Sequence, residues 1–408
     1  MKLLFIALFI ALFLELFRRR NQMIFYVGVL VTQLEALLGL YLIDRGAYMS
    51  EQRRFGFENG SFYLYLLFAV AAVLVFFLAC TVIKLRTRTG DNRWLFGVAS
   101  GTFLLICLYA SVKNPTAGRF DIFANLGALT RFFNFFQIAY EGLYIYSMFK
   151  ERRLSARLMY LFVAMFIYFV KHDQFSSFFE CVLVFLMSCV IFKENSFGTV
   201  RMSRVLKAAV SLVIVGVLCG ALVYKFSNMA DALTFVLRLV NGGQLFWGTI
   251  NLVHQHTSPP NMQAYFDNFF SFQMYHGSSE YGLGQLMCAV TGPICISFLD
   301  SGVRMSGGYP SMLIFQWGLV PAFFLNIVCT IAFVLLLKLQ MFIVRELNFL
   351  VFLLFFVKVY AMYSDFYIMG EYGTWGFKNL VYVALVLSAI FLYRPRERNQ
   401  PEMLTSGS

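Results

Sequence analysis

The feature that most constrains this chain is a series of apolar runs, each about as long as a helix that crosses a bilayer. About eleven such runs can be placed by length and composition. They cover 3–17, 23–43, 61–83, 95–112, 132–149, 158–171, 177–192, 208–226, 312–337, 347–363 and 377–393. Because an unpaired backbone amide is costly in lipid, spans of this length must be helices. The sequence therefore predicts an all-α integral membrane protein.

The composition supports this class. The chain has 408 residues, of which 60% are hydrophobic and 13% are charged, whereas a soluble domain carries about a quarter charged residues. The net charge of +12 does not call for nucleic acid as a partner. In a membrane protein, Lys and Arg collect in the cytoplasmic loops, and this is sufficient to explain the excess.

The positions of the basic residues predict the topology. Arg18, Arg19 and Arg20 follow the first apolar run, whereas a signal peptide carries its charges before that run, so we expect a retained span. If these arginines are cytoplasmic, most of the other Lys and Arg residues fall in alternate loops on the same side. The interval 228–311 then lies outside. We expect a multi-pass protein of the bacterial inner (cytoplasmic) membrane, with that interval in the periplasm.

This topology divides the chain into four parts. Residues 1–227 hold transmembrane helices 1–8, and 228–311 form the large periplasmic loop. Residues 312–393 hold helices 9–11, and 394–408 form a cytoplasmic tail.

The interval 228–311 is too polar and too interrupted to be expected as a span. Turn residues at Asn241-Gly242-Gly243, Pro259-Pro260 and Gly292-Pro293 separate its apolar runs. A connection this long usually has a function. It also holds Cys288 and Cys295. If the loop is extracytoplasmic they can pair, although spacing alone does not fix the geometry.

Several cations break the topology pattern because they fall at outer span ends or in outer loops. One interpretation is that they reach lipid headgroups. The other is that they bind a substrate, since a guanidinium suits phosphate oxygens two bonds at a time. On the second interpretation, the phosphate ligands are Arg131, Arg238 and Arg304, with Arg119 and Lys171 as weaker candidates.

A general base is expected in the same loop. His276 is followed four residues later by Glu280, a carboxylate that can orient an imidazole. The alternative for any single histidine is an ordinary surface side chain. His254 and His256 give only a weak metal signal, because zinc needs three or four ligands. The sequence has no nucleotide-binding motif. We therefore expect no metal and no cofactor, and a substrate that is already in the membrane.

Three short motifs between 281 and 320 carry a resemblance to a known family. They are Tyr281-Gly282-Leu283-Gly284, Arg304-Met305-Ser306-Gly307-Gly308-Tyr309-Pro310-Ser311 and Phe315-Gln316-Trp317-Gly318-Leu319-Val320. The chain resembles the O-antigen (Wzy-type) polysaccharide polymerases, which are related to the O-antigen ligases. The motifs cover about forty residues, whereas the likeness in topology extends over the whole chain.

The resemblance implies a GT-C-like bundle of helices, shared by polymerases and ligases, under a helical periplasmic loop. It implies transfer of a growing glycan from undecaprenyl diphosphate onto an incoming lipid-linked oligosaccharide repeat unit, without metal or nucleotide. Arg304 matches the arginine before the Gly-rich step, and Tyr309 belongs to the same motif. We expect both to bind the diphosphate or the substrate. Expected partners are this lipid-linked oligosaccharide and membrane lipid, and a chain-length regulator is left open.

Two other activities compete with the polymerase. O-antigen ligases carry a histidine in the motif after the loop, and Gly307-Gly308-Tyr309-Pro310-Ser311 has none, which favours the polymerase. A lipid-linked sugar flippase would show paired repeats and short outer loops, and we find neither in the sequence.

Overall fold

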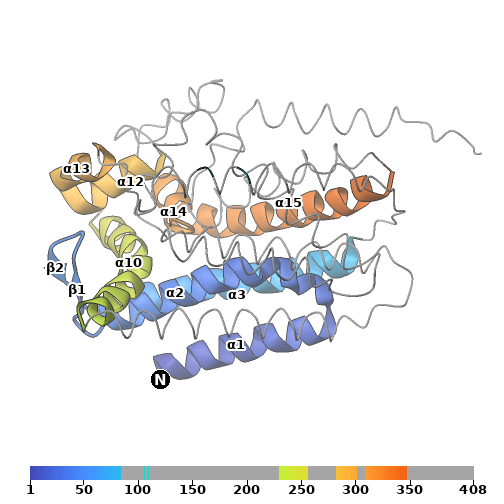
Figure 1. The fold of residues 1–408 in the computed structure, drawn as a ribbon, viewed down its shortest axis with the longest axis horizontal. Coiled ribbons are helices and arrows are strands. Elements are labelled where there is room, and N and C mark those ends of the chain that lie inside the picture. Colours follow the sequence, from blue (N-terminus) through green and yellow to red (C-terminus); the bar gives the residue numbers. More distant parts are fainter. Residues whose placement is uncertain (84–104, 106–108, 110–228, 256–281, 301–307, 347–408) are drawn as a thin grey trace, which may run out of the picture.

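The computed structural model describes residues 1–83, 105, 109, 229–255, 282–300 and 308–346 (Figure 1). These parts are mostly helical and include long apolar helices, as expected for an all-α membrane protein. Apart from residues 105 and 109, the spans predicted between 95 and 226 and after 346 lie outside the described residues. The total of about eleven spans therefore stays a prediction.

The first three predicted spans are helices. They are α1 (Lys2–Arg19), α2 (Val27–Ile43) and α3 (Ser61–Val82). The predicted second span begins in a 3-10 helix, η1 (Asn21–Tyr26), which turns the chain from α1 into α2. The buried Tyr26 ring lies 5.0 Å from the Phe76 ring of α3, and its hydroxyl accepts a hydrogen bond from Gln33 of α2 at 2.8 Å. These contacts join η1 to both helices.

A small β-hairpin connects α2 to α3. Strand β1 (Tyr48–Met49) pairs antiparallel with β2 (Arg54–Phe55). Met49 is completely buried, so the hairpin packs against the bundle and does not extend from it. We call the connection 44–60 the hairpin loop. The end of the bundle where it lies is called the hairpin end.

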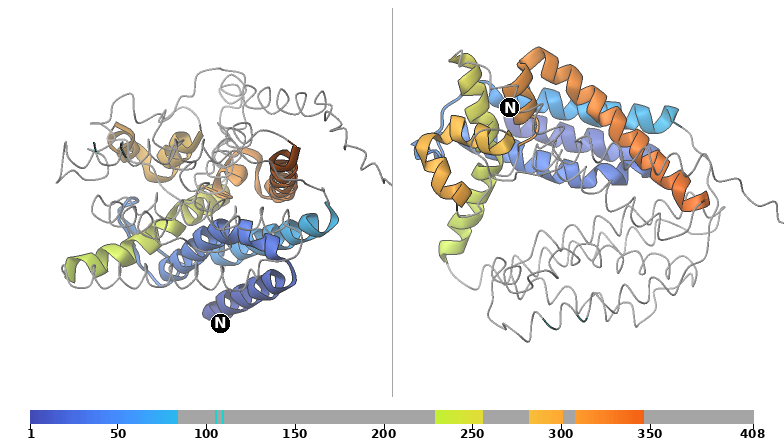
Figure 2. Two further views of the ribbon diagram at one scale, coloured as in Figure 1. Left: turned by 45° about the vertical axis from the view of Figure 1, so that its right-hand side comes forward. Right: turned by 90° about the horizontal axis from the view of Figure 1, so that it is seen from above.

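Helix α10 (Met229–His254) crosses α2 and α3 at a steep angle at the hairpin end (Figure 2). The turn predicted at Asn241-Gly242-Gly243 is wrong, because the helix is continuous through these residues. The glycines serve close packing instead. A Cβ atom on Gly243 would lie 2.6 Å from the backbone nitrogen of Leu40, and one on Gly39 would lie 2.2 Å from the Leu239 carbonyl oxygen. Small residues let two helix backbones approach this closely.

The next described segment is bent, as Gly292-Pro293 predicts. It consists of α12 (Gly282–Thr291), the 3-10 helix η3 (Gly292–Ile294) and α13 (Cys295–Asp300). A disulfide joins Cys288 to Cys295, with their Cα atoms 5.0 Å apart. By length and apolar composition alone, Gly282–Leu299 also qualifies as a span, which the sequence analysis did not anticipate.

The predicted span at 312–337 is two helices. They are α14 (Ser311–Trp317) and α15 (Leu319–Glu346), separated at Gly318, which has a φ of 79°. That conformation suits glycine and ends α14. Helix α15 packs along α3, with Phe323 edge-on to Phe68 at 5.5 Å. Both α3 and Leu319–Lys338 are long and apolar enough to cross a membrane.

Several ends of the described helices lie together at one end of the bundle. The start of α1, the end of α2, the start of α3 and the start of α15 lie at the hairpin end, together with α10, α12 and α13 (Figure 1). Arg18 and Arg19, in the last turn of α1, lie at the opposite end. The predicted outer segments that the structure describes therefore gather at one end of the bundle.

Candidate polar site at the hairpin end

Most residues predicted for the site lie outside the described part of the chain. This is true of His276, Glu280, Arg304 and the three basic residues of the earlier loops, so all of these assignments stay predictions. The three basic residues are Arg119, Arg131 and Lys171.

Two predicted residues do fall in described elements. Arg238 belongs to α10, and Tyr309 lies two residues before the start of α14 with its side chain buried. Helices α10 and α14 contact each other. The elements that carry these two residues therefore meet at the hairpin end.

A carboxylate of the hairpin loop is partly buried against α10. Glu51 accepts a hydrogen bond from the Asn241 amide at 3.3 Å and a second one from the Gln244 amide. Burial disfavours the charged carboxylate and raises its pKa to about 7, an effect that the bond from Gln244 only partly opposes. Glu51 is therefore a group that titrates near neutral pH while docked on a helix.

An arginine lies beside it. Arg54 donates two hydrogen bonds to the side-chain oxygen of Gln52, at 3.0 Å from Nε and 2.7 Å from Nη2. Gln52 is fixed in turn, since its amide donates to the Gln244 carbonyl oxygen of α10 at 2.7 Å. The guanidinium carbon lies 4.6 Å from the centre of the Trp247 ring. Partial burial lowers the pKa of Arg54.

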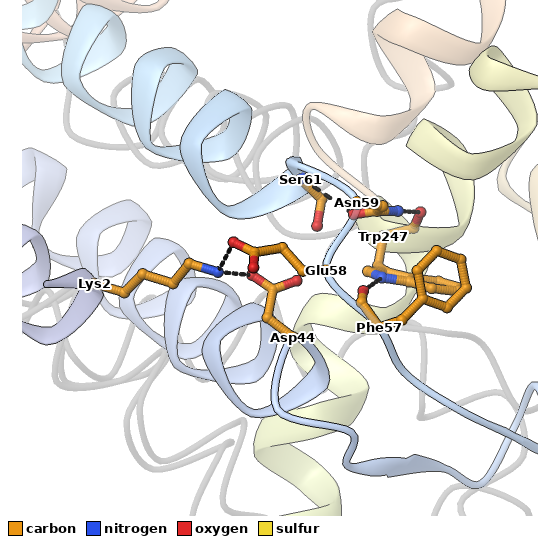
Figure 3. A network of polar contacts seen from close by, with 7 residues as sticks. All are labelled: Lys2, Asp44, Phe57, Glu58, Asn59, Ser61 and Trp247. Carbon is orange, nitrogen blue, oxygen red and sulfur yellow. Dashed lines mark hydrogen bonds and ion pairs between the residues drawn. The ribbon is translucent and has the colours of Figure 1, made fainter.

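The tryptophan itself anchors the rest of the hairpin loop (Figure 3). Trp247 is fully buried, and its indole N–H donates to the Phe57 carbonyl oxygen at 2.8 Å. The Asn59 amide donates to the Trp247 carbonyl oxygen at 3.1 Å, while the Asn59 side-chain oxygen accepts from the Ser61 backbone N–H. The Trp247 indole is thus held in place under Arg54 by contacts to the opposite end of the loop.

A separate ion-pair cluster ties α1 to the same loop (Figure 3). The Lys2 ammonium lies 2.7 Å from Asp44 and 2.6 Å from Glu58. The Asp44 side chain is only 1% exposed, and burial raises its pKa even though the lysine opposes the shift. The Lys2 ammonium also lies within 6 Å of the Phe62 and Tyr63 ring centres, at 5.7 and 5.4 Å. This lysine is neutralised by its neighbours.

The sequence analysis missed Glu51 and Arg54. It examined cations at outer span ends but passed over the first outer loop, where Glu51-Gln52-Arg53-Arg54 places two adjacent arginines against the topology trend. These adjacent arginines in an outer loop were the sequence signal that could have identified Arg54. The pairing of this loop with α10, about 190 residues later in the chain, had no signal in the sequence.

Within the described ranges, no group of three His, Cys, Asp or Glu side chains gathers as a metal site would require. His254 is exposed at the end of α10. The described polar chemistry of the hairpin end is therefore that of amides, guanidinium groups, one ammonium and carboxylates that differ in burial.

Part of the chain matches a known protein family. A family model described as a family of unknown function (DUF6418) matches residues 276–383, about a quarter of the chain. This region begins at His276 and includes the three motifs on which the polymerase resemblance rests. No curated protein and no solved structure matches the chain.

Proposed function

We propose that the protein is an O-antigen-type polymerase. It joins undecaprenyl-diphosphate-linked oligosaccharide repeat units at the outer face of a bacterial inner membrane. The growing glycan is the donor, and a sugar hydroxyl of the incoming unit is the acceptor. The proposal rests first on the motif resemblance between 281 and 320.

One structural observation carries the proposal further. Leu283 of the first motif and Met312, which directly follows the second, belong to one buried apolar cluster with Leu245 of α10. Sequence segments almost thirty residues apart therefore pack together against α10. Convergence of the motifs is what an active site built from this loop requires.

Two further observations favour an outward-facing site. The Cys288–Cys295 disulfide belongs to the same cluster of helices, and disulfides persist in oxidising compartments such as the periplasm. Arg18 and Arg19 lie at the opposite end of the bundle, the end that the positive-inside rule assigns to the cytoplasm.

The proposed reaction breaks the bond between the anomeric carbon of the donor and its diphosphate. The acceptor hydroxyl oxygen forms the new glycosidic bond, and its proton passes to a base, for which His276 with Glu280 is the candidate. The departing diphosphate gains charge as the bond breaks. Fixed guanidinium groups such as that of Arg304 stabilise this charge most where water is scarce. A single displacement of this kind inverts the anomeric configuration, and a product of retained configuration would contradict it.

The first prediction concerns Arg304. Arg304→Ala should abolish long-chain product while the protein still inserts into the membrane, because a developing diphosphate charge loses its fork-shaped partner. Arg304→Lys should also be poor, since an ammonium does not replace two parallel N–H groups. The measurement is the length of lipid-linked glycan in cells that carry each variant, with membrane levels of the protein as control.

Deletion of the gene separates the polymerase from the ligase. Loss of a polymerase leaves a single repeat unit on the lipid A core, whereas loss of a ligase leaves none. Wild-type chain lengths in the Arg304→Ala strain would remove Arg304 from the site.

A further inference from the structure

Among the residues that the structure describes, only neutral groups orient Arg54. Gln52 binds its Nε and Nη2 atoms, and the Trp247 ring lies against its carbon. A guanidinium has five N–H donors, and two of them are used in these bonds. Within the described part of the chain, Arg54 forms no ion pair. Three N–H groups are therefore left for a further acceptor.

Three cations of α1 contrast with this arrangement, and Arg45 and Arg53 of the hairpin loop are exposed, whereas Arg54 is partly buried. Lys2 is neutralised by two carboxylates, and Arg18 and Arg19 both pair with Glu15. Partial burial of a cation without a counter-charge costs free energy, and a positioned anion would recover it. The lowered pKa of Arg54 has the same cause. The chain thus fixes one guanidinium in place and provides no described carboxylate for it.

The position of Arg54 connects it to the motif region. The side chain lies over Trp247, two residues along α10 from Leu245. Leu245 packs in the cluster that joins Leu283 and Met312. Within the same turn of α10, Trp247 therefore contacts the Arg54 guanidinium, and Leu245 packs against the segments that carry the motifs.

We propose that Arg54 is a phosphate-binding residue, oriented by Gln52 and Trp247, for the diphosphate of a lipid-linked substrate at the hairpin end. The proposal deepens the proposed function and rests on it for the identity of the lipid. Its chemistry is independent of that identity. A planar fork with free N–H groups, at the end of a membrane bundle, suits the oxygens of a phosphate group. Phosphates at a bilayer surface come from two sources, a lipid-linked substrate and ordinary phospholipid headgroups.

The neighbouring Glu51 carboxyl group does not prevent phosphate binding at Arg54. Its carboxylate faces the Asn241 and Gln244 amides of α10, not the guanidinium. Because its pKa is about 7, about half of the molecules carry it as a neutral acid at neutral pH. Repulsion between this carboxyl group and a bound phosphate is correspondingly reduced.

The test measures binding of two probes to the full-length protein in detergent micelles. The probes are undecaprenyl diphosphate and phosphatidylglycerol, and binding is followed by titration with native mass spectrometry. Arg54→Gln should weaken undecaprenyl diphosphate binding about tenfold or more, as expected for loss of charge-assisted hydrogen bonds. Arg54→Lys should fall between wild type and Arg54→Gln. Arg53→Gln, which changes the exposed neighbour, is the matched control and should stay within about twofold of wild type, as expected for an exposed surface change.

Each outcome decides the assignment. Weaker binding of undecaprenyl diphosphate alone supports a substrate site, whereas equal weakening of both probes supports a phosphate site that binds headgroups. Unchanged binding of both probes in folded Arg54→Gln overturns the proposal. Circular dichroism and the melting temperature of each variant verify the fold. Wild-type protein could bind undecaprenyl diphosphate through Arg54 but form no glycan ladder from lipid-linked units. That result would contradict the polymerase proposal and would leave Arg54 as a phosphate-binding residue.

Discussion

Two helix pairs in this protein are joined by opposite kinds of contact. Helices α3 and α15 pack through aromatic rings, with Phe68 against Phe323 and Phe76 against Phe333. One amide crosses this interface, from Asn326 to the Phe68 carbonyl oxygen at 3.2 Å. Helices α2 and α10 instead meet through Gly39 and Gly243, with backbone almost in contact with backbone.

The difference indicates which helix pair tolerates less change in its side chains. Ring packing fills a lipid-like space and tolerates small changes in shape. A glycine contact does not, and here it sets the position of α10, whose Gln244 and Trp247 fix the hairpin loop. The polar residues of the hairpin end are therefore positioned by a close contact between the backbones of α2 and α10, and a binding site requires such fixed positions. Helices α3 and α15 pack beside them through aromatic side chains.

The largest expected effect on stability is at the contact between Gly39 of α2 and Gly243 of α10. Gly243→Val should destabilise the protein by about 3 kcal/mol or more, because a side chain at this position meets backbone atoms that cannot move aside. The measurement is the melting temperature and monodispersity of the purified protein in detergent. Gly46→Asn is the control, because Gly46 has a φ of 86° and open space around its Cβ position, and Asn tolerates that conformation.

A substitution between α3 and α15 should destabilise the protein less than Gly243→Val does. Phe323→Leu should cost only about 1 kcal/mol, because an apolar side chain of similar size can repack against Phe68. Equal losses in Gly243→Val and Phe323→Leu would show that the two interfaces do not differ in the way described.

A smaller effect is expected at the ion-pair cluster. Lys2→Met should cost about 2 kcal/mol, because it leaves the almost fully buried Asp44 carboxylate without its partner. The double variant with Asp44→Asn should recover part of this loss, as a double-mutant cycle of melting temperatures would record. Arg18→Met removes an exposed ion pair and should change the melting temperature little. No coupling in the cycle would mean that Lys2 does not neutralise Asp44.

The smallest effect is a pH dependence located at Glu51. Its folded pKa of about 7 exceeds the usual 4.5, so the native state binds the proton more tightly than the unfolded state. The stability that this group contributes is therefore greatest at acidic pH and falls as pH rises from about 4.5 to about 7. Because Glu51 is partly exposed, we expect a change of only about 1 kcal/mol over this window.

The Glu51 prediction is tested by the melting temperature of wild type and Glu51→Gln between pH 5 and pH 8. The difference between the two should increase with pH, since the variant keeps a neutral side chain throughout. Glu58→Gln, which alters an exposed carboxylate of the same loop, should not reproduce this change. Parallel curves for wild type and Glu51→Gln would place the titrating group elsewhere.

The sequence predicted the apolar helices well because length and composition alone define a span. It predicted α3 to within one residue and the break at Gly292-Pro293. It failed where tertiary packing decides. Gly242 and Gly243 look like a turn but allow a helix to approach α2 closely, and Gly318 divides one predicted span into α14 and α15.

For the site, the sequence did not identify the residues that the structure brings together at the hairpin end. Arg238 lies on α10 and Tyr309 lies two residues before α14, and these two helices contact each other. Arg54 and Glu51 come from a short loop whose partner helix lies about 190 residues away in the chain. Contacts this distant in sequence leave no periodicity or spacing that a single chain reveals.

The central claim is that the hairpin end binds a lipid-linked diphosphate and joins the glycans it carries. The most direct test incubates the purified protein with undecaprenyl-diphosphate-linked repeat units alone, without metal or nucleotide, and separates the products by size. We predict a ladder of glycans that grow by one repeat unit at a time and are absent with Arg304→Ala. Repeat units that remain single with active, correctly folded wild-type protein would contradict the account.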